Sequence, residues 1–317
     1  MKLTDKLRER YSRTISLHDI TEADMEALIN TTVSVVGAGG LGSPALRLLT
    51  ALGFGRIRII DRDVVELSNI QRQTVYNTQD IDMPKAEAAA ANLSLMNPNV
   101  EFEPLSVSLD EGNARELLKE SDIIIDGLDS FQARHAVNKA SVAMNIPYIF
   151  AGAIEYQANI STFIPRTTGC LNCFIGEASD DPDYTCANVG VSSELLSIAA
   201  AIEVREAVLL STGKTPILGN RLMVIDLYSL NFDFFDLGRS ENCEVCSTTD
   251  LKFSEKSEDP IVTVLCSGAF HIAPTEITTL DLESIATQIE TSNKVTKTGR
   301  SITVELSPGL QITLMQS

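Results

Sequence analysis

The length, composition and charge of the chain set the first limits on its function. With 317 residues, 44 % of them hydrophobic and 21 % charged, the chain is long enough for one large globular domain and a smaller one. The net charge of −18 argues against nucleic acid or an anionic membrane as partner, because phosphate-rich partners are bound by basic surfaces. Residues 1–10 are polar and no run of about 18 apolar residues occurs, so we expect a cytoplasmic protein.

Predicted strands and helices alternate through the first half of the chain. After a helix at residues 18–30, strands are expected at 32–36, 56–60, 123–125 and 148–151, and helices at 43–52, 85–96 and 131–144. Such alternation produces βαβ units and a parallel sheet, and the scarcity of polar residues in the strands indicates that both sheet faces are covered. The prediction is an α/β fold with a doubly wound, Rossmann-like, mostly parallel sheet.

The pattern changes after residue 157. Residues 158–165 have a period close to two, which predicts antiparallel strands appended to the sheet. A helix at 192–211 and a strand at 222–225 complete the main body. We interpret residues 231–260 as a linker around the last cysteine pair. Residues 261–317 are expected to form a small C-terminal α+β module, with strands near 261–266, 302–306 and 310–314 and a helix near 282–290. The predicted domains are therefore 1–247 and 248–317.

A glycine-rich motif lies between the first predicted strand and the following helix. Gly37, Gly39 and Gly42 have G-x-G-x-x-G spacing, which permits a tight turn and lets the backbone approach a phosphate at a helix N-terminus. Asp61, 19 residues after Gly42 and next to the second strand, is placed to accept hydrogen bonds from ribose hydroxyls. The motif indicates a nucleotide site, most often that of a dehydrogenase. The alternative is that the glycines only form a turn.

Polar residues farther along the chain favour ATP over NAD. They follow the ends of predicted strands or open a helix: Asn69, Arg72, Gln73, Lys85 and Asp129. An open parallel sheet binds its ligands beyond these strand ends. ATP chemistry needs cations on the phosphates and a carboxylate for Mg²⁺. Each residue alone could be a solvated surface group, whereas the set favours a triphosphate.

Five motifs occur in the order seen in the ThiF/MoeB/HesA group of the ubiquitin-activating-enzyme superfamily. They are Arg10-Tyr11-Ser12-Arg13, the glycine loop 37–42, Asn69-x-x-Arg72-Gln73, Pro84-Lys85 and Asp126-x-x-Asp129. The chain resembles this group over roughly residues 5–247. The resemblance implies an adenylyltransferase, usually a homodimer, that binds ATP and Mg²⁺. Such enzymes attach AMP to the C-terminal glycine carboxylate of a β-grasp, ubiquitin-like protein and release pyrophosphate.

The resemblance also implies roles for single residues. The nucleotide-binding set comprises Gly37, Gly39, Gly40, Gly42, Asp61, Asn69, Arg72, Gln73, Lys85 and Asp129. Within it, Asn69, Arg72 and Lys85 would hold the phosphates and stabilise the charge on the leaving pyrophosphate.

The resemblance also implies catalytic roles for Asp129 and Arg13. Asp129 would bind Mg²⁺, and Arg13 would reach across the dimer to the partner's ATP. One departure is Ser130, which stands where relatives often have Asn.

Four of the six cysteines form two C-x-x-C pairs, Cys170 with Cys173 and Cys243 with Cys246. Four thiolates at such spacing predict a structural, tetrahedral Zn²⁺ site. The alternative is a redox pair, but neither pair is predicted to sit at a helix start beside a βαβ unit. The resembling family also has this zinc, and its role would be to tie the late part of the chain back to the sheet.

The remaining cysteines differ in their surroundings. Cys186 follows an acidic, proline-containing stretch in a predicted crossover loop at about residues 174–190. A similar Thr-Cys in relatives crosses the active site, and in some it bonds to the activated carboxyl or sulfur of the carrier. Cys186 is therefore a candidate nucleophile; the alternative is a semi-buried thiol kept by the fold. Cys266 is interpreted as a core residue, and the three histidines as structural.

The sequence thus predicts an ATP-dependent adenylyltransferase for a ubiquitin-like carrier ending in Gly-Gly. The sequence does not decide whether the activated carrier serves sulfur transfer or protein conjugation. It also does not decide whether a thioester or persulfide forms on Cys186. No rhodanese-like module follows the cysteine pairs, so a separate sulfur donor or downstream protein is expected. Residues 261–317 would recruit the carrier or a partner, or only stabilise the fold. The alternatives are an enzyme that adenylates a peptide or small carboxylate, and a non-catalytic nucleotide-binding module.

Overall fold

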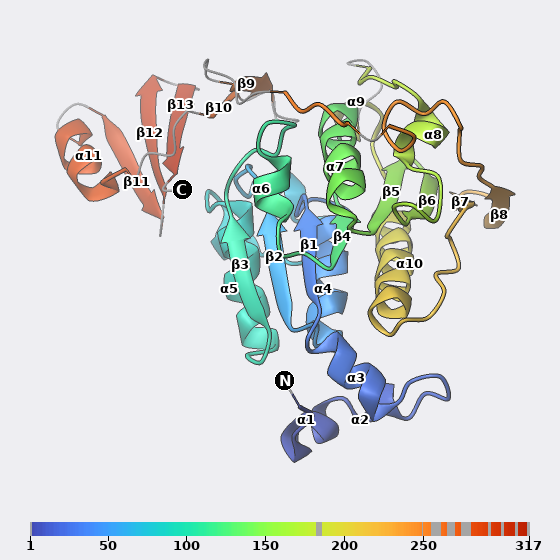
Figure 1. The fold of residues 1–317 in the computed structure, drawn as a ribbon. Helices are drawn as coiled ribbons and strands as arrows, with labels where there is room; N and C mark the ends of the chain where they lie inside the picture. Colours follow the sequence, from blue (N-terminus) through green and yellow to red (C-terminus); the bar gives the residue numbers. More distant parts are fainter. Residues whose placement is uncertain are drawn as a thin grey trace.

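An eight-stranded sheet forms the centre of the protein in the computed structural model (Figure 1). The structure describes residues 2–181, 186–248, 250–254, 261–264, 270–273, 280–290, 293–298, 301–307 and 310–315. The strand order is β3-β2-β1-β4-β5-β6-β7-β8. The strands are β1 (Thr32–Val36), β2 (Arg56–Ile60), β3 (Glu101–Leu105), β4 (Ile123–Asp126), β5 (Tyr148–Ile154), β6 (Gln157–Phe163), β7 (Arg221–Asp226) and β8 (Asn231–Asp236).

The sheet is parallel from β3 to β5 and antiparallel from β5 to β8. The chain leaves β1 toward β2 and β3, then returns to place β4 on the other side of β1. The prediction of a doubly wound, mostly parallel sheet with appended antiparallel strands is confirmed. Because successive connections diverge between β1 and β4, the loops after these two strands flank the crevice where such sheets bind ligands.

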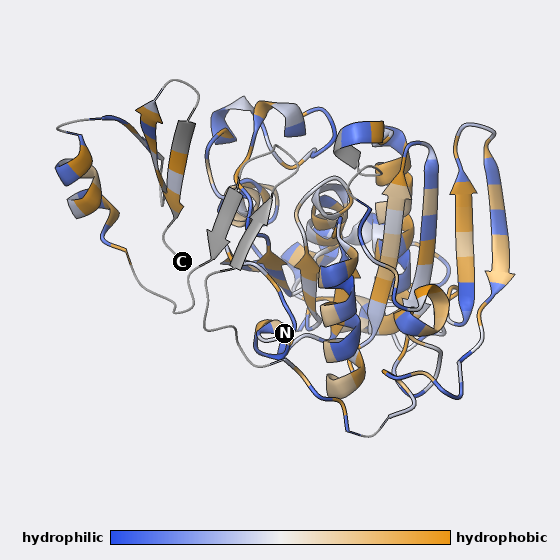
Figure 2. Ribbon diagram, turned by 90° about the horizontal axis from the view of Figure 1, so that it is seen from above, coloured by the Kyte–Doolittle hydropathy of each residue, from blue (hydrophilic) through white to orange (hydrophobic). Residues whose placement is uncertain are grey.

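Helices cover both faces of the parallel strands, as the apolar strands predict. One core packs α4 (Gly42–Leu52), α5 (Lys85–Met96) and α10 (Ser193–Ser211) against the sheet. A second core, on the opposite face, contains α6 (Ala114–Leu118), α7 (Phe131–Met144) and α8 (Leu171–Ile175). The side chains of β4 alternate between these cores: Ile123 and Ile125 belong to the first and Ile124 to the second. Figure 2 shows apolar colouring along the strands and polar colouring on the outer turns of the helices.

The short helices α1 (Asp5–Arg10), α2 (Ser12–Ile15) and α3 (Glu22–Leu28) precede the sheet. Three other short helices, η1 (Leu67–Asn69), η2 (Thr78–Asp80) and α9 (Cys186–Val189), lie in connecting segments. Among the helices that the structure describes, none is both long and apolar enough to cross a bilayer.

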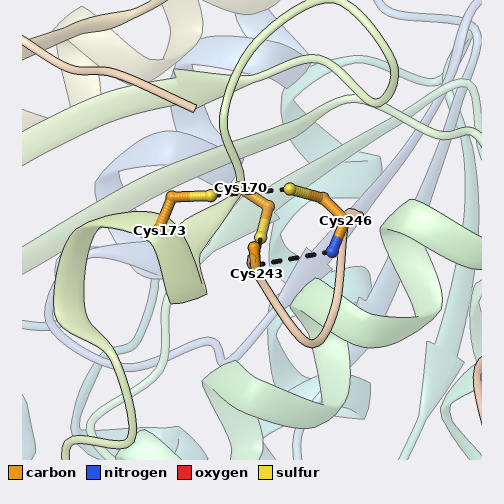
Figure 3. Close-up of side chains that lie close together, drawn as sticks. All are labelled: Cys170, Cys173, Cys243 and Cys246. Carbon is orange, nitrogen blue, oxygen red and sulfur yellow. Dashed lines mark hydrogen bonds between the residues drawn. The ribbon is translucent and has the colours of Figure 1, made fainter. Parts of the chain in front are cut away.

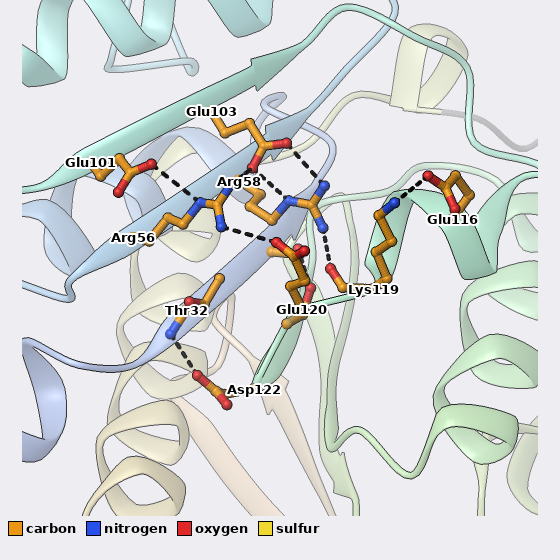
Figure 4. Close-up of polar contacts among 11 residues, drawn as sticks. Thr32, Arg56, Arg58, Glu101, Glu103, Glu116, Lys119, Glu120 and Asp122 are labelled. Atoms are coloured by element: carbon orange, nitrogen blue, oxygen red, sulfur yellow. Dashed lines mark hydrogen bonds and ion pairs between the residues drawn. The ribbon is translucent and has the colours of Figure 1, made fainter.

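Charged side chains form a network of ion pairs at the outer end of the sheet, around β2 and the edge strand β3 (Figure 4). Arg58 is buried and meets the Glu103 carboxylate with two nitrogens, at 2.9 and 3.0 Å. Arg56 reaches Glu103 at 2.6 Å and Glu120 at 3.1 Å. Burial opposes ionisation of Glu103, but Arg58 and Arg56 hold the pKa of its carboxyl below the ordinary value. These ion pairs place charged side chains at the β3 edge of the sheet, where an apolar surface would favour pairing with another chain.

One prediction about the fold is wrong. Residues 231–260 were expected to be a linker, whereas residues Asn231–Asp236 form β8, the outer strand of the sheet. All six of its residues are exposed, so the strand lacks the alternation of buried and exposed positions by which a half-buried strand is recognised.

The C-terminal segment contains more strands than expected. The strands β9 (Ile261–Val264) and β10 (Phe270–Ala273) form an antiparallel pair. After α11 (Leu282–Ile289), the strands β11 (Lys294–Thr298), β12 (Ser301–Ser307) and β13 (Leu310–Met315) form an antiparallel three-stranded sheet. The strands β10 and β11 were not predicted. Cys266 lies outside the described residues.

Candidate nucleotide site and cysteine cluster

The loops after β1 and β4 cross at backbone contact, which only glycine permits. Gly37 has φ +91°, and a Cβ on Gly42 would lie 1.8 Å from its carbonyl oxygen. A Cβ on Gly127, the residue after β4, would lie 2.1 Å from the same oxygen. The backbone N–H groups of Gly37 and Gly127 donate to Ile60 and Val36. The predicted glycine loop therefore has a partner in Gly127, which was not predicted because it occupies an unspecified position of the motif Asp126-x-x-Asp129.

Two other glycines and a glutamine complete the loop. A Cβ on Gly40 would approach Leu196 of α10 to 2.8 Å, so α10 packs directly on the loop. At Gly39 the nearest atoms to such a Cβ, Gln73 Nε2 and Gly127 O, are 3.9 Å away. Gln73 is buried, and its Oε1 has no hydrogen-bond partner among the described residues. An unpaired buried amide oxygen next to a phosphate-loop glycine is suited to accept a donor from a ligand.

Asp61 is joined to the glycine loop by a hydrogen bond. Its Oδ2 accepts from Ala38 N at 2.7 Å, and its Oδ1 accepts from Asp63 N at 2.7 Å. Burial raises the pKa of the Asp61 carboxyl to about 6, although the charge of Lys85 opposes the shift. Each oxygen keeps a lone pair for a further donor. This geometry suits the predicted contact with ribose hydroxyls.

Lys85 lies at the start of α5 as predicted, but it is buried and paired. Its Nζ lies 2.9 Å from Asp63 Oδ2. Burial alone would lower the pKa of the Lys85 ammonium, but Asp61, Asp63 and Asp129 together raise it. Asp129, exposed after β4, is thus within electrostatic reach of Lys85. Asp63 was missed; its only signal was its position two residues after Asp61 at a strand end.

Asn69 and Arg72 make contacts local to their own turn. The buried Asn69 accepts a hydrogen bond from Glu66 N at 3.1 Å, and Arg72 Nη1 donates to Ser68 O at 2.9 Å. Ser193 of α10 donates to Gln71 O at 3.1 Å, which ties this turn to the helix that packs on Gly40. The phosphate contacts of Asn69 and Arg72 stay predictions.

A buried polar cluster fixes the loop that leads to Asp129. Arg134 of α7 donates from Nε to Asp126 Oδ2 at 3.1 Å and from Nη2 to Leu128 O at 2.6 Å. The Tyr148 hydroxyl also donates to Asp126. Ser130, the departure from the family pattern, caps α7 through a hydrogen bond from Ala133 N.

Arg13 lies far from the nucleotide loop of its own chain. It is exposed on α2, at the opposite end of the sheet from the loops after β1 and β4 (Figure 1). The neighbouring Tyr11 receives a hydrogen bond from Asn97, at the end of α5. The structure therefore does not bring Arg13 to its own site, and a role there requires a second subunit.

The four predicted metal ligands point toward one another (Figure 3). Their sulfur atoms all lie within 4.8 Å, with Cys170 and Cys243 at 3.6 Å and Cys173 and Cys246 at 3.5 Å. Zn–S bonds of about 2.3 Å place tetrahedral sulfurs about 3.8 Å apart, so the donor set fits Zn²⁺. Cys170 is the N-cap of α8, but α8 lies between the antiparallel strands β6 and β7 and not beside a βαβ unit. The structure brings both cysteine pairs together in one cluster, whereas a redox role for a single pair would not require the second pair.

The described ends of the crossover loop are each held by hydrogen bonds to the main body of the protein. At its first end, Asp180 Oδ1 accepts from Phe131 N at the start of α7, 2.7 Å away. At its second end, Glu155 N donates to Gly190 O and Ser192 N donates to Glu155 O, just before α10. Cys186 begins α9, and its side chain lies outside the described residues.

A hollow of about 440 Å³ lies beside the cysteine cluster and not at the glycine loop. Charged residues of both signs line it, among them Glu111, Lys139 and Glu244, together with His135 of α7. The hollow therefore does not coincide with the candidate nucleotide site at the glycine loop and Asp61.

A family model described as the ThiF family matches residues 11–246. The chain belongs to the ThiF family. The predicted ThiF/MoeB/HesA membership and adenylyltransferase class are confirmed. The SAMP-activating enzyme E1 of Haloferax volcanii is 34 % identical over 241 residues, covering 75 % of this chain and 88 % of that protein. The sulfur carrier protein adenylyltransferase of Thermus thermophilus is 34 % identical over 254 residues, covering 78 % and 93 %.

One relative also matches part of the C-terminal segment. The sulfur carrier protein ThiS adenylyltransferase of Bacillus subtilis is 31 % identical over 294 residues, covering 88 % of this chain and 84 % of that protein. The matched part is longer than residues 1–246, so it extends into the C-terminal segment. Among solved structures, Escherichia coli MccB with ATP is 24 % identical, covers 75 % of each chain and superposes with a TM-score of 0.67, which supports the fold.

Proposed function

We propose that this protein activates the C-terminal glycine carboxylate of a ubiquitin-like, β-grasp carrier by adenylation. The observation that carries the proposal is the grouping of the glycine loop, Asp61, Lys85 and Asp129. They lie where the order of strand connection reverses, between β1 and β4. Family relatives named as SAMP-activating and sulfur carrier adenylyltransferases support this acceptor class.

Different residues have different roles in the proposed reaction. The glycine loop and the α4 N-terminus hold the phosphates, and Asp61 holds the ribose. Lys85, Arg72 and Asn69 contact the phosphates. A carboxylate oxygen of the carrier bonds to the α-phosphorus while the bond from that phosphorus to its bridging oxygen breaks, and pyrophosphate leaves. Mg²⁺ held by Asp129 would neutralise charge on the departing pyrophosphate.

The partner subunit would complete each site. Arg13 is exposed and distant from its own glycine loop, so it serves a homodimer in which each Arg13 reaches the other subunit's ATP. The cationic guanidinium would stabilise charge on the phosphates during transfer.

The carrier would dock on an exposed aromatic surface at the antiparallel end of the sheet. This aromatic surface comprises Tyr156, Tyr228, Leu230, Phe232 and Phe234. An exposed apolar patch on an edge strand is typical of a protein-binding surface. The Tyr156 ring lies 5.8 Å from that of Tyr228, and Tyr156 follows Glu155, which holds the second end of the crossover loop. A tail extending from this surface would pass under that loop toward Gly40.

The four cysteines would hold a structural Zn²⁺, and the chain would divide into an adenylation domain, residues 1–247, and a C-terminal module, residues 248–317. The zinc would tie the segment after β8 to α8 and the sheet. The C-terminal module would recruit the carrier or a downstream protein. Sulfur transfer would need a separate sulfur donor.

The adenylation proposal is tested by ATP–pyrophosphate exchange with a carrier ending in Gly-Gly. We expect Asp129→Ala to abolish exchange, a loss of about a hundredfold or more, because pyrophosphate charge would no longer be offset. Glu116→Ala is the matched control, since Glu116 is an exposed acid paired only with Lys119, and it should exchange normally. Normal exchange in Asp129→Ala, with folding intact by circular dichroism, contradicts the proposal. Stimulation by a short peptide or small carboxylate, but by no carrier, identifies the other acceptor class.

A separate experiment tests Cys186 as the nucleophile that receives the activated carrier. We expect Cys186→Ala to retain pyrophosphate exchange, because adenylation needs no thiol. It should form no thioester with the carrier, a step in which the thiolate would displace AMP, and no persulfide when a persulfide-bearing sulfur donor is supplied. Non-reducing electrophoresis and intact mass spectrometry detect either adduct. A Cys186→Ala enzyme that still transfers carrier at the unmodified rate rules out this role.

A further inference from the structure

Helix α7 (Phe131–Met144) faces both the nucleotide loop and the cysteine cluster. Its N-terminus follows Asp129, and Arg134 in its first turns fixes the loop before Asp129. One turn later, Asn138 faces the start of α8, where the first cysteine pair lies. The adenylation chemistry uses none of the polar side chains that α7 directs toward α8.

Asn138 connects α7 to a predicted metal ligand. It is fully buried, and its Nδ2 lies 3.6 Å from Cys170 Sγ and 3.3 Å from Asn172 Oδ1. Its Oδ1 accepts a hydrogen bond from Leu171 N at 2.9 Å. An N–H donor directed at a ligand sulfur stabilises the thiolate and fixes its orientation, as outer-shell groups do in metal sites. The side-chain amide of Asn138 thus holds both Cys170 and the first residue of α8.

His135 continues the contacts toward the crossover loop. Its Nδ1 lies 3.1 Å from Asn172 Oδ1, and its Nε2 lies 2.9 Å from Ala178 O. Asn172 Oδ1 and the Ala178 carbonyl oxygen both only accept, so both ring nitrogens donate, as they do in the imidazolium form. Ala178 precedes Asp180, which caps the first turn of α7. The first end of the crossover loop is therefore held to α7 at two points.

We infer that Asn138 and His135 are positioning residues that couple the order of the cysteine site to the first end of the crossover loop. The contacts run from Cys170 through Asn138, Asn172 and His135 to Ala178. The helix α8 between them has five residues, too few to be stable by itself. Its position depends on the metal site and on Asn138. Loss of the metal releases Asn172, then His135, and then the Ala178 carbonyl. The inference rests on the proposed Zn²⁺ site, but not on adenylation.

The test uses the full-length protein and two readouts that do not depend on activity. One is the rate of zinc release to a colorimetric chelator, after the zinc content of the wild type has been measured. The other is amide hydrogen exchange in peptides covering residues 176–181, with β1 as internal control. Removing zinc from the wild type should accelerate exchange at 176–181 and leave β1 protected.

The variants separate the two positioning residues. Asn138→Leu should release zinc about 10–100-fold faster, the usual effect of losing an outer-shell contact, and should also accelerate exchange at 176–181. Asn138→Asp, which keeps the acceptor for Leu171 N, serves if the leucine variant does not fold, and should release zinc faster as well. His135→Ala should accelerate exchange at 176–181 roughly fivefold with zinc release unchanged. Ser141→Ala removes another buried hydrogen bond of α7, to Ile146 O, and should change neither readout.

Three results would overturn the inference. They are a wild type that contains no bound zinc, Asn138 variants that release zinc at the wild-type rate, and exchange at residues 176–181 that is unaffected by zinc removal or by His135→Ala. Pyrophosphate exchange is measured on the same preparations. A protein with intact coupling but no exchange refutes the adenylation proposal alone.

Discussion

At the scale of single residues, we propose that the charge on Asp61 controls nucleotide binding. Burial raises the pKa of its carboxyl to about 6, and Lys85 limits the rise. Both oxygens accept backbone N–H groups, one from the glycine loop and one from Asp63. In the ionised form each oxygen has capacity for a ribose hydroxyl as well. Protonation converts one oxygen into a donor and removes an acceptor.

We expect ATP affinity to fall as the pH decreases through about 6, up to tenfold per pH unit below it. The Kd for ATP, measured by calorimetry from pH 5 to 8, checks this. Unfolding at low pH through Asp61 cannot cause this loss of affinity. Because the pKa of its carboxyl is raised in the folded state, this group stabilises the fold at low pH, and that stabilisation is lost as the pH rises through 6. Asp61→Asn should bind more weakly at pH 8 and lose the inflection near pH 6. An unchanged inflection in that variant would assign it to another group.

At the scale of elements, β8 extends the sheet without extending its core. Phe232, Phe234 and Phe235 are 43 %, 46 % and 54 % exposed, respectively. A strand that pairs on one edge and leaves its other edge and its aromatic side chains open is a template for a partner. The aromatic surface continues through Tyr228 to Tyr156, near the second end of the crossover loop, so one partner could contact both.

We predict that truncating the most exposed part of the aromatic surface weakens carrier binding. In the double variant Tyr228→Ser with Leu230→Ser, the KM for the carrier in pyrophosphate exchange should rise about tenfold or more. The KM for ATP and the Tm should hardly change, because these side chains are 83 % and 71 % exposed. Leu95→Ser is the matched control, since Leu95 is 86 % exposed on α5. An unchanged carrier KM would place the docking surface elsewhere.

At the scale of the whole molecule, the proposed catalytic residues divide between two ends of the sheet. Lys85 begins α5 and Asp129 follows β4, while α2, which carries Arg13, lies at the opposite end of the sheet (Figure 1). A rigid sheet separates them within one chain. If Arg13 takes part in the reaction, the dimer is the smallest active unit.

Mixing two inactive variants tests this arrangement. Arg13→Ala and Asp129→Ala should each lose pyrophosphate exchange. Random reassociation of equal amounts gives mixed dimers in which one site has both residues, so about a quarter of wild-type activity should return. Differently tagged subunits and co-purification verify that mixed dimers form. Mixed dimers without recovered activity, or a fully active Arg13→Ala enzyme, would contradict a role across the interface.

The most accurate sequence predictions were local ones. The strands Thr32–Val36 and Arg56–Ile60 and the helices Lys85–Met96 and Phe131–Met144 have the bounds that the sequence predicted. Their β-branched or alanine-rich composition and the Gly, Asn and Pro residues at their ends act through neighbours in the chain. The strand β8 was missed because neither of its faces is buried, so no hydrophobic period marks it.

The sequence by itself determined the doubly wound class, the glycine loop and the four cysteines, because each depends on spacing along a short stretch. Only the tertiary structure decided which residues meet. It paired Gly127 with Gly37, Asp63 with Lys85 and Asn138 with Cys170. It also placed Arg13 at the far end of the sheet from its own nucleotide loop. Such pairs follow from strand register and helix packing. Both depend on many contacts between residues distant in the chain, so the two partners of a pair have no fixed separation in the sequence.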